Sequence, residues 1–325
     1  MERKEQIAPY PKVRPNWLKF GLRALVTVGI LAPLLFFHPG GLLVAMKKTG
    51  FVLWASVVAS TILCHVILAA KWRILLKAAG NGAGSMDSLR AHGAGLFANI
   101  CLPSLIGGDV VRTGMISRDA GSLPSALTGV VADRLTDIAS LIILAAAGML
   151  LLPSATSRTE TRVLILVAGL LGLGMFLATI TIKRINPKRF PTRIARTLEG
   201  LKDALAAMSR KKAEAILALL ITTSIQGLFI FLNVLIADKI GIHVPVAVWL
   251  IAFPLAKMVA FLPLSLGGLG VREGVVAAVL LPFSVPTALA IAQSLVWQTV
   301  TFAVGILGGM IALWIGYRKP RPQVA

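Results

Sequence analysis

Charged residues are scarce in this chain. Lys, Arg, Asp and Glu together make up 14% of its 325 residues, whereas soluble domains carry about a quarter. Hydrophobic residues make up 57%, and the mean hydropathy is +0.84. Several apolar stretches reach the roughly 20 residues that a helix needs to cross about 30 Å of hydrocarbon. We therefore expect an all-α fold: a polytopic bundle forming one integral membrane domain over residues 1–325.

Acidic residues are fewer than basic ones. The chain has 13 Asp and Glu and 33 Lys and Arg, which gives a net charge of +20. A nucleic-acid-binding protein would need its basic residues on a soluble face, and this chain has almost none. The basic excess is better explained by topology. Cytoplasmic loops retain Lys and Arg, which also attract anionic lipid head groups.

Cysteine and histidine are also few, which bears on disulfides and metals. The two cysteines, Cys64 and Cys101, lie inside apolar segments, where a small buried hydrophobic residue is expected. They exclude a disulfide framework. The four histidines show no metal-ligand spacing; they are His38, His65, His92 and His243. We expect neither a metal nor a cofactor.

The first apolar stretch follows a basic leader but lacks the cleavage site of a signal peptide, so we expect it to remain as an anchor. It is one of six full spans that hydropathy predicts. These are Trp17–Phe37, Phe51–Leu76, Leu123–Leu152, Val163–Ile182, Ala213–Ala237 and Thr287–Gly316. The last contains a Gly305/Gly309 pair, which indicates close helix packing.

Two further apolar stretches, Leu89–Ile106 and Val246–Leu266, are short or interrupted, and each runs into a Gly-Gly pair. With these two as re-entrant segments, 25 Lys and Arg fall on the cytoplasmic side and 5 on the outer side. The cytoplasmic count includes four residues from Lys71 to Arg90 and ten in a loop over 183–212. The bias predicts cytoplasmic N- and C-termini in a bacterial inner membrane. Complete spans are the alternative for both stretches.

The chain nearly repeats itself. Residues Leu102–Gly114 align without gaps with Leu262–Gly274, 160 residues further on, and seven of thirteen positions are identical. The shared frame is Pro-x-x-x-Gly-Gly-x-x-Val-Arg-x-Gly. Three predicted crossings separate the copies, so the copies would face opposite sides of the membrane. This is the inverted-repeat plan of many transporters, with halves at about 89–152 and 246–316.

Each copy combines features that suit an anion. Gly-Gly lets the chain reverse and brings backbone N–H groups near a ligand, and a helix that starts after it offers its positive end. Arg112 and Arg272, one turn later, could hold a phosphate bidentately, or each could simply snorkel to the interface. The residues predicted to bind a head group are Gly107, Gly108, Asp109, Arg112, Gly267, Gly268, Arg272 and Glu273.

Further charges lie inside apolar segments. Asp133 and Asp137 share a helix face, and Arg134 stands three residues before Asp137. Charge in hydrocarbon costs several kcal/mol, so these residues are predicted to gate or couple transport, or else to pair only with one another. Lys257 has the same two alternatives, as a substrate contact or as the partner of Glu273. Gln226, Asn233, Gln293 and Gln298 are predicted to hydrogen-bond across helices.

These motifs resemble the flippase-like family typified by the transmembrane region of lysylphosphatidylglycerol synthase, the multiple peptide resistance factor, a UPF0104-type group. The resemblance covers most of the chain. It rests on Asn99, Pro103, Gly108–Arg112, Asp133–Asp137, Pro263 and Gly267–Glu273. It implies movement of an aminoacylated or otherwise modified lipid between leaflets. The chain departs from the family at Leu266, where Pro is frequent, and at Asp133, where Glu is usual. The family's soluble aminoacyl-transferase domain is not expected here.

Three functions are open at this point. The first is a flippase or scramblase for a phosphate-bearing lipid. The second is an enzyme acting on polyprenyl-phosphate sugars, although no paired metal-binding carboxylates, nucleotide loop or nucleophile-base set appears. The third is a non-transporting assembly subunit. The expected partners are the membrane and a lipid with an anionic head group, not a nucleic acid; a lipid-modifying enzyme and a second copy of the chain stay open.

Overall fold

The computed structural model describes residues 41–101, 107–119, 123–152, 211–260 and 269–318, with isolated positions between 184 and 210. Throughout these ranges the secondary structure is helical, and no strand occurs in them. The α-helices are α2 (Gly41–Thr49), α3 (Phe51–Ala78), α4 (Ser85–Cys101), α5 (Gly107–Asp119), α6 (Leu123–Leu151), α9 (Lys212–Ile240), α10 (Val246–Ala260), α11 (Val271–Leu280) and α12 (Thr287–Arg318), with a short 3-10 helix, η3 (Leu281–Phe283). The predicted all-α class is confirmed for this part of the chain.

Four of these helices are long and apolar enough to cross a membrane: α3, α6, α9 and α12. Each begins within one residue of its predicted start and ends within three of its predicted end. The agreement arises because a run of about 28 apolar residues has no other way to satisfy its backbone in hydrocarbon. Two other predicted spans, Trp17–Phe37 and Val163–Ile182, and most of the 183–212 loop lie outside the described residues. The count of six therefore stays a prediction.

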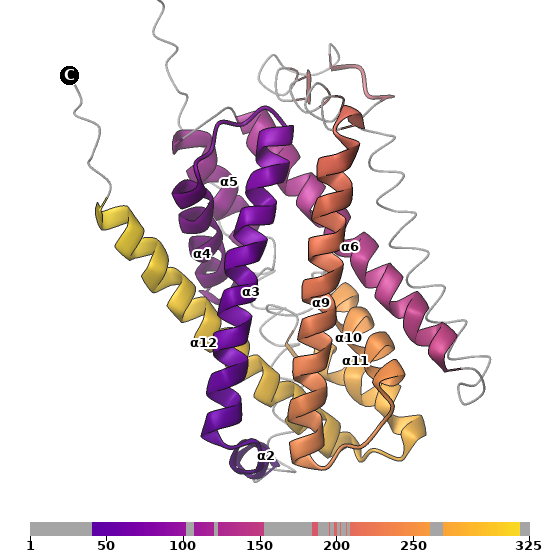
Figure 1. Cartoon of the computed structure of the whole chain (residues 1–325). Helices are drawn as coiled ribbons and strands as arrows, with labels where there is room; N and C mark the ends of the chain where they lie inside the picture. The colour runs from indigo at the N-terminus through magenta and orange to yellow at the C-terminus, as the bar shows by residue number, and fades with distance from the viewer. Residues whose placement is uncertain are drawn as a thin grey trace, which may run out of the picture.

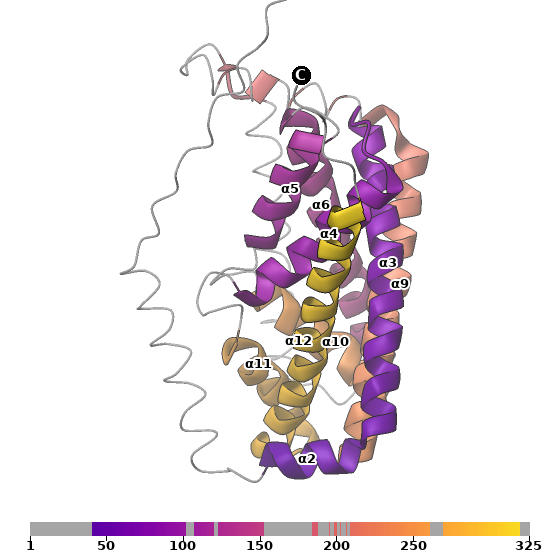
Figure 2. The same cartoon turned by 90° about the vertical axis from the view of Figure 1, so that its left-hand side faces the viewer.

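Four of the shorter helices form two pairs, which lie at opposite ends of the bundle (Figure 1). Helices α4 and α5 contact one another near the end where α3 finishes and α9 begins. Helices α10 and α11 contact one another near the other end, where α9 finishes and α12 begins. Helix α2 runs across that second end, as the turned view shows (Figure 2). The predicted apolar stretches Leu89–Ile106 and Val246–Leu266 thus contribute α4 and α10.

Small residues bring α4 and α12 together. A Cβ on Gly93 would lie 2.5 Å from the backbone oxygen of Gly308, so neither helix could keep its place with a larger residue there. Gly305 faces Ile100, and Gly309 faces the ring of Phe97, both on α4. The predicted close packing at the Gly305/Gly309 pair is confirmed. Backbone approach of this kind drives helix association where lipid supplies no hydrophobic force.

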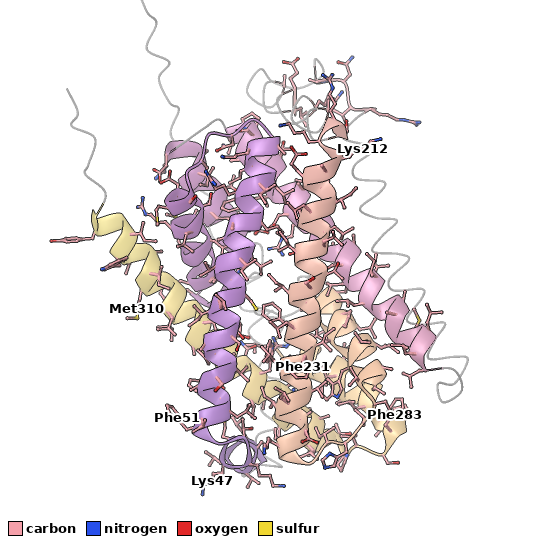
Figure 3. The ribbon with its side chains drawn as sticks, viewed as in Figure 1. Lys47, Phe51, Lys212, Phe231, Phe283 and Met310 are labelled. Atoms are coloured by element: carbon pink, nitrogen blue, oxygen red, sulfur yellow. The ribbon has the colours of Figure 1, made fainter. Side chains whose placement is uncertain are left out.

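The outer surface of the long helices is apolar. Phe51, Phe231 and Met310 are 78%, 53% and 58% exposed, and they lie along the bundle between Lys47 at one end and Lys212 at the other (Figure 3). Exposed apolar area on this scale marks a surface covered by lipid rather than water. The protein is therefore embedded in a membrane as a multi-pass chain. Its polar residues must then find partners inside the bundle.

Candidate functional site

A cavity of about 500 Å³ lies inside the bundle. Its walls come from all eight helices from α3 to α6 and from α9 to α12. Arg112 of α5 and Arg272 of α11 both line it, so the two helix pairs from opposite ends of the bundle meet at one hollow. Most of the predicted site residues line the same cavity: Gly108, Asp109, Arg112, Asp133, Arg134, Asp137, Lys257 and Arg272.

Lys71 stands at the centre of one polar wall. Its ammonium lies 2.7 Å from Asp133 and 3.4 Å from Asp137, both on α6, and donates to the hydroxyl of Thr222 on α9 at 3.0 Å. The Lys71 side chain is 1% exposed. Lys71, which the charge count places with the cytoplasmic residues 71–90, is thus a buried charge within the bundle. Helix α3 continues past Lys71 to Ala78. The Lys71 ammonium therefore pairs with carboxylates inside the bundle.

Arg112 shares the carboxylate of Asp133 with Lys71. One Nη atom of Arg112 lies 2.7 Å from Asp133 and 2.9 Å from Asp109. The guanidinium also stacks over the ring of Trp72, 4.7 Å from its centre, where a cation–π contact adds to the attraction. The side chain of Arg112 is 6% exposed, so the alternative in which this residue snorkels to the interface is wrong.

Arg134 closes the same group of charges. Its Nε and Nη2 donate to the two oxygens of Asp109 at 2.7 and 2.8 Å, a bidentate pair. Its Nη1 lies 3.7 Å from Asp137. The pairing of Arg134 with Asp137 expected from their spacing is present, but it is the longer contact. Pairing within the α6 trio alone is excluded, because α3 and α5 supply the closer partners.

These six side chains form what we call the charge network: Lys71, Asp109, Arg112, Asp133, Arg134 and Asp137. Its three cations and three carboxylates balance, which is the condition for burying charge at tolerable cost. Because all six members line the cavity, the network presents polar groups to a ligand without presenting net charge. The ion pairs of the network also connect α3, α5 and α6 at this wall of the cavity.

The first Gly-Gly pair does not form the hinge that was predicted. Gly107 and Gly108 are the first two residues of α5 rather than a turn before it. The N–H of Gly108 donates to the Asn99 side chain at 2.9 Å and is not free for a ligand. A Cβ on Gly108 would collide with the backbone oxygen of Gly95. Gly108 therefore serves the close approach of α5 to α4.

At the opposite end, Gly270 takes the strained conformation. It precedes α11 with φ +84°, a region that favours glycine, and its N–H donates to Glu273 at 2.6 Å. Glu273 also accepts from Arg272 at 2.8 Å and is fully buried. Arg272 reaches the side-chain oxygen of Gln298 on α12 as well. Gly267 and Gly268 lie outside the described residues.

Lys257 extends from α10 into the cavity. Its ammonium donates to the side-chain oxygen of Gln226 on α9 at 3.0 Å and lies 5.9 Å from the ring centres of Phe229 and Phe253. The alternative in which Lys257 pairs with Glu273 is wrong, because that carboxylate is held by Arg272 and Gly270. No carboxylate of the described residues lies within 4.0 Å of the Lys257 ammonium.

The model of the lysylphosphatidylglycerol synthase transmembrane region matches residues 21–309. The chain belongs to that family. A relative within it, the UPF0104 membrane protein PH1989 of Pyrococcus horikoshii, is 22% identical over 280 residues, which cover 76% of this chain and 82% of the relative. No solved structure matches the chain. The predicted resemblance to this family is confirmed.

In this member of the family, the fold brings together residues that sequence spacing did not connect. The ring nitrogens of His65 on α3 and His92 on α4 lie 3.2 Å apart, and both rings line the cavity. Cys64 is buried as expected, but Cys101 is exposed, contrary to expectation. Among the described residues, no three His, Cys, Asp or Glu side chains gather as metal ligands would.

The remaining cavity wall of this family member mixes amides with aromatic rings. Gln293 on α12 donates to Asn233 on α9 at 3.0 Å, and with the Gln226 and Gln298 contacts above, the predicted hydrogen bonds across helices are confirmed. Phe253 and Trp297 meet edge to face, with ring centres 6.2 Å apart. The hollow therefore offers polar groups beside apolar ones, as an amphiphilic ligand requires.

Proposed function

We propose that this protein is a lipid translocase, a flippase or scramblase that moves a phosphate-bearing lipid from one leaflet to the other. The head group would occupy the cavity while the acyl or prenyl chains stay in the bilayer. Aminoacylated or glycosylated head groups fall within this class. The proposal assigns transport rather than catalysis to the site, and no chemical step is attributed to any of its residues.

The observation that carries this proposal is the joint lining of one cavity by both helix pairs. Arg112 comes from the pair at one end of the bundle and Arg272 from the pair at the other. A site reached by elements of both ends suits a ligand that must be handed from one face to the other. A purely structural charge network would need no hollow beside it.

The guanidinium groups retain donors for a phosphate. A guanidinium has five N–H donors, and Arg112 and Arg272 each form their ion pairs through one Nη atom. The Nε of Arg112 has no hydrogen-bond partner among the described residues. Arg272 is 20% exposed in its side chain, so it can turn toward a ligand more readily than Arg112. We assign both to head-group recognition.

In this proposal the α4–α5 and α10–α11 pairs are re-entrant hairpins that form an inverted repeat. The first would enter from the cytoplasm and the second from outside, with both chain termini cytoplasmic in a bacterial inner membrane. Support comes from the position of the two pairs at opposite ends of the bundle (Figure 1) and from the shared sequence frame of the two copies. Asp133, Arg134, Asp137 and Lys71 would gate the cavity from its polar wall.

Arg112→Ala and Arg272→Ala test this function. We expect each to lower the rate of head-group transfer in proteoliposomes by about tenfold or more, the equivalent of losing roughly 1.4 kcal/mol of transition-state binding. The measurement is the loss of a fluorescent phospholipid's signal when a membrane-impermeant quencher is added. Lys239→Ala, at an exposed position of α9 outside the cavity, is the matched control and should transfer lipid at the wild-type rate.

Unchanged transfer in both arginine variants would reject the assignment of the site. If proteoliposomes with the wild-type protein transfer lipid no faster than protein-free vesicles, the translocase proposal itself is rejected. Each variant is first checked for folding by size-exclusion chromatography in detergent, so that misfolding is not mistaken for a loss of transport.

A further inference from the structure

We infer that Lys257 is the head-group anion site of the cavity, and that the cavity selects a lipid whose head group carries a single net negative charge, as a phosphodiester does. This inference rests on the proposed function and specifies its substrate. Arg112 and Arg272 would still donate hydrogen bonds to the head group, whereas Lys257 would supply the positive charge that is not already paired.

Charge counting identifies Lys257. Of the described residues, five cations and three carboxylates line the cavity. The charge network accounts for three of each, and Glu273 beneath the wall neutralises Arg272. Among the described residues that line the cavity, one positive charge remains, and it belongs to Lys257. The stretches 102–106 and 261–268, between the helices of each pair, contain no charged residue.

The surroundings of Lys257 hold the ammonium in place without neutralising it. The rings of Phe229 and Phe253 face it at equal distances of 5.9 Å, and the Gln226 oxygen accepts one of its three N–H donors. Cation–π contacts and one amide hydrogen bond offset only part of the cost of desolvating a charge. An anion entering the cavity would supply the missing counter-charge.

The charge balance also limits the ligand class. All three carboxylates of the network are already engaged. Asp109 pairs with two arginines, Asp133 with Lys71 and Arg112, and Asp137 with Lys71 and Arg134. A head group with a free ammonium would meet no unpaired carboxylate in the described wall. A pyrophosphate would bring more negative charge than the one surplus cation balances. Of the head groups that the proposed function admits, a phosphodiester without a compensating amine therefore matches the site, and an aminoacylated one does not.

Binding to the purified full-length chain in detergent tests this inference. The probes are short-chain phosphatidylglycerol, short-chain phosphatidylcholine and farnesyl pyrophosphate, measured by native mass spectrometry. We expect the wild type to bind phosphatidylglycerol about tenfold more tightly than the other two. Lys257→Met should weaken phosphatidylglycerol binding by about tenfold and leave phosphatidylcholine unchanged. Lys257→Arg should keep the wild-type order, and Lys239→Met, at an exposed lysine of α9, should match the wild type.

Lys257→Gln serves as a second neutral variant if Lys257→Met does not fold. Wild-type phosphatidylglycerol binding in the neutral variant, or wild-type preference for the pyrophosphate or the zwitterion, overturns the inference. The same variants in the proteoliposome assay separate the two proposals. If the wild type transfers lipid and the neutral variant transfers it at the same rate, the inference is wrong and the translocase proposal is retained. No transfer by the wild type, with Lys257-dependent binding intact, would defeat the translocase and support the anion site.

Discussion

Asp133→Asn is expected to lower the free energy of unfolding by about 3 kcal/mol. The Asp133 carboxylate lies 2.7 Å from both Lys71 and Arg112, and their side chains are 1% and 6% exposed. Removing one partner from a buried ion pair costs about 3–5 kcal/mol, because the remaining charge is uncompensated. We place the loss at the lower end of this range because Asp137 still faces Lys71 and Asp109 still faces Arg112.

Unfolding by sodium dodecyl sulfate in mixed micelles measures this loss. Asp119→Asn is the matched control, since Asp119 pairs with Arg90 at 3.3 Å where both side chains are 29% exposed. An ion pair that reaches solvent contributes about 0–1 kcal/mol, so this variant should stay close to the wild type. Equal losses in the two variants would show that burial does not set the cost and that the charge network is not closed as described.

Glu273→Gln is expected to cost about 2–3 kcal/mol of stability. The glutamine can still accept from Gly270, but it cannot balance Arg272, whose remaining described partner is the neutral Gln298. Loss of a charge-assisted hydrogen bond at a fully buried acceptor gives this magnitude. The loss should be smaller than at Asp133 because the Arg272 side chain is 20% exposed and can be partly hydrated.

The double variant Glu273→Gln with Arg272→Gln separates charge from shape. Removing both charges leaves no uncompensated group, so stability should recover by about 1–2 kcal/mol relative to Glu273→Gln alone. The same detergent titration measures both proteins. A double variant as unstable as the single one would mean that Glu273 acts by fixing the Gly270 turn, not by neutralising Arg272.

Hydropathy predicted the long helices well for a physical reason. A span must satisfy every backbone group internally, so its ends follow the apolar run, as Phe51 at the start of α3 and Leu151 at the end of α6 show. Likewise, Gly305 and Gly309 were correctly assigned to close packing, because small residues four apart have few other uses in an apolar helix.

The roles of Lys71 and Gly108 depend on tertiary contacts that the sequence does not show. Counting Lys71 with the cytoplasmic charges of 71–90 overlooks that it lies inside the predicted span Phe51–Leu76, seven residues before the end of the 28-residue α3. That position was a usable signal for an interior charge. Gly108 was misread because a glycine pair suits a hinge and a tight helix contact equally, and only Gly95 and Asn99 across the interface distinguish them.

Other parts of the site had no local signal. His65 and His92 are 27 residues apart and meet only because α3 and α4 pack side by side. Lys257 lacks a carboxylate partner because Glu273 pairs with Arg272, the residue that precedes it in the sequence. Charge balance over a whole cavity is a property of the assembled bundle, and no spacing rule reports it.

The most direct test of the central claim is photochemical labelling in vesicles. A phosphatidylglycerol analogue with a photoreactive diazirine on its glycerol head group is irradiated with the reconstituted protein, and mass spectrometry maps the adducts. The account predicts head-group adducts on cavity residues such as Phe253, Trp297 and Val276, reduced in Lys257→Met. Adducts confined to the outward face of α12, at Leu313 and Trp314, would contradict it.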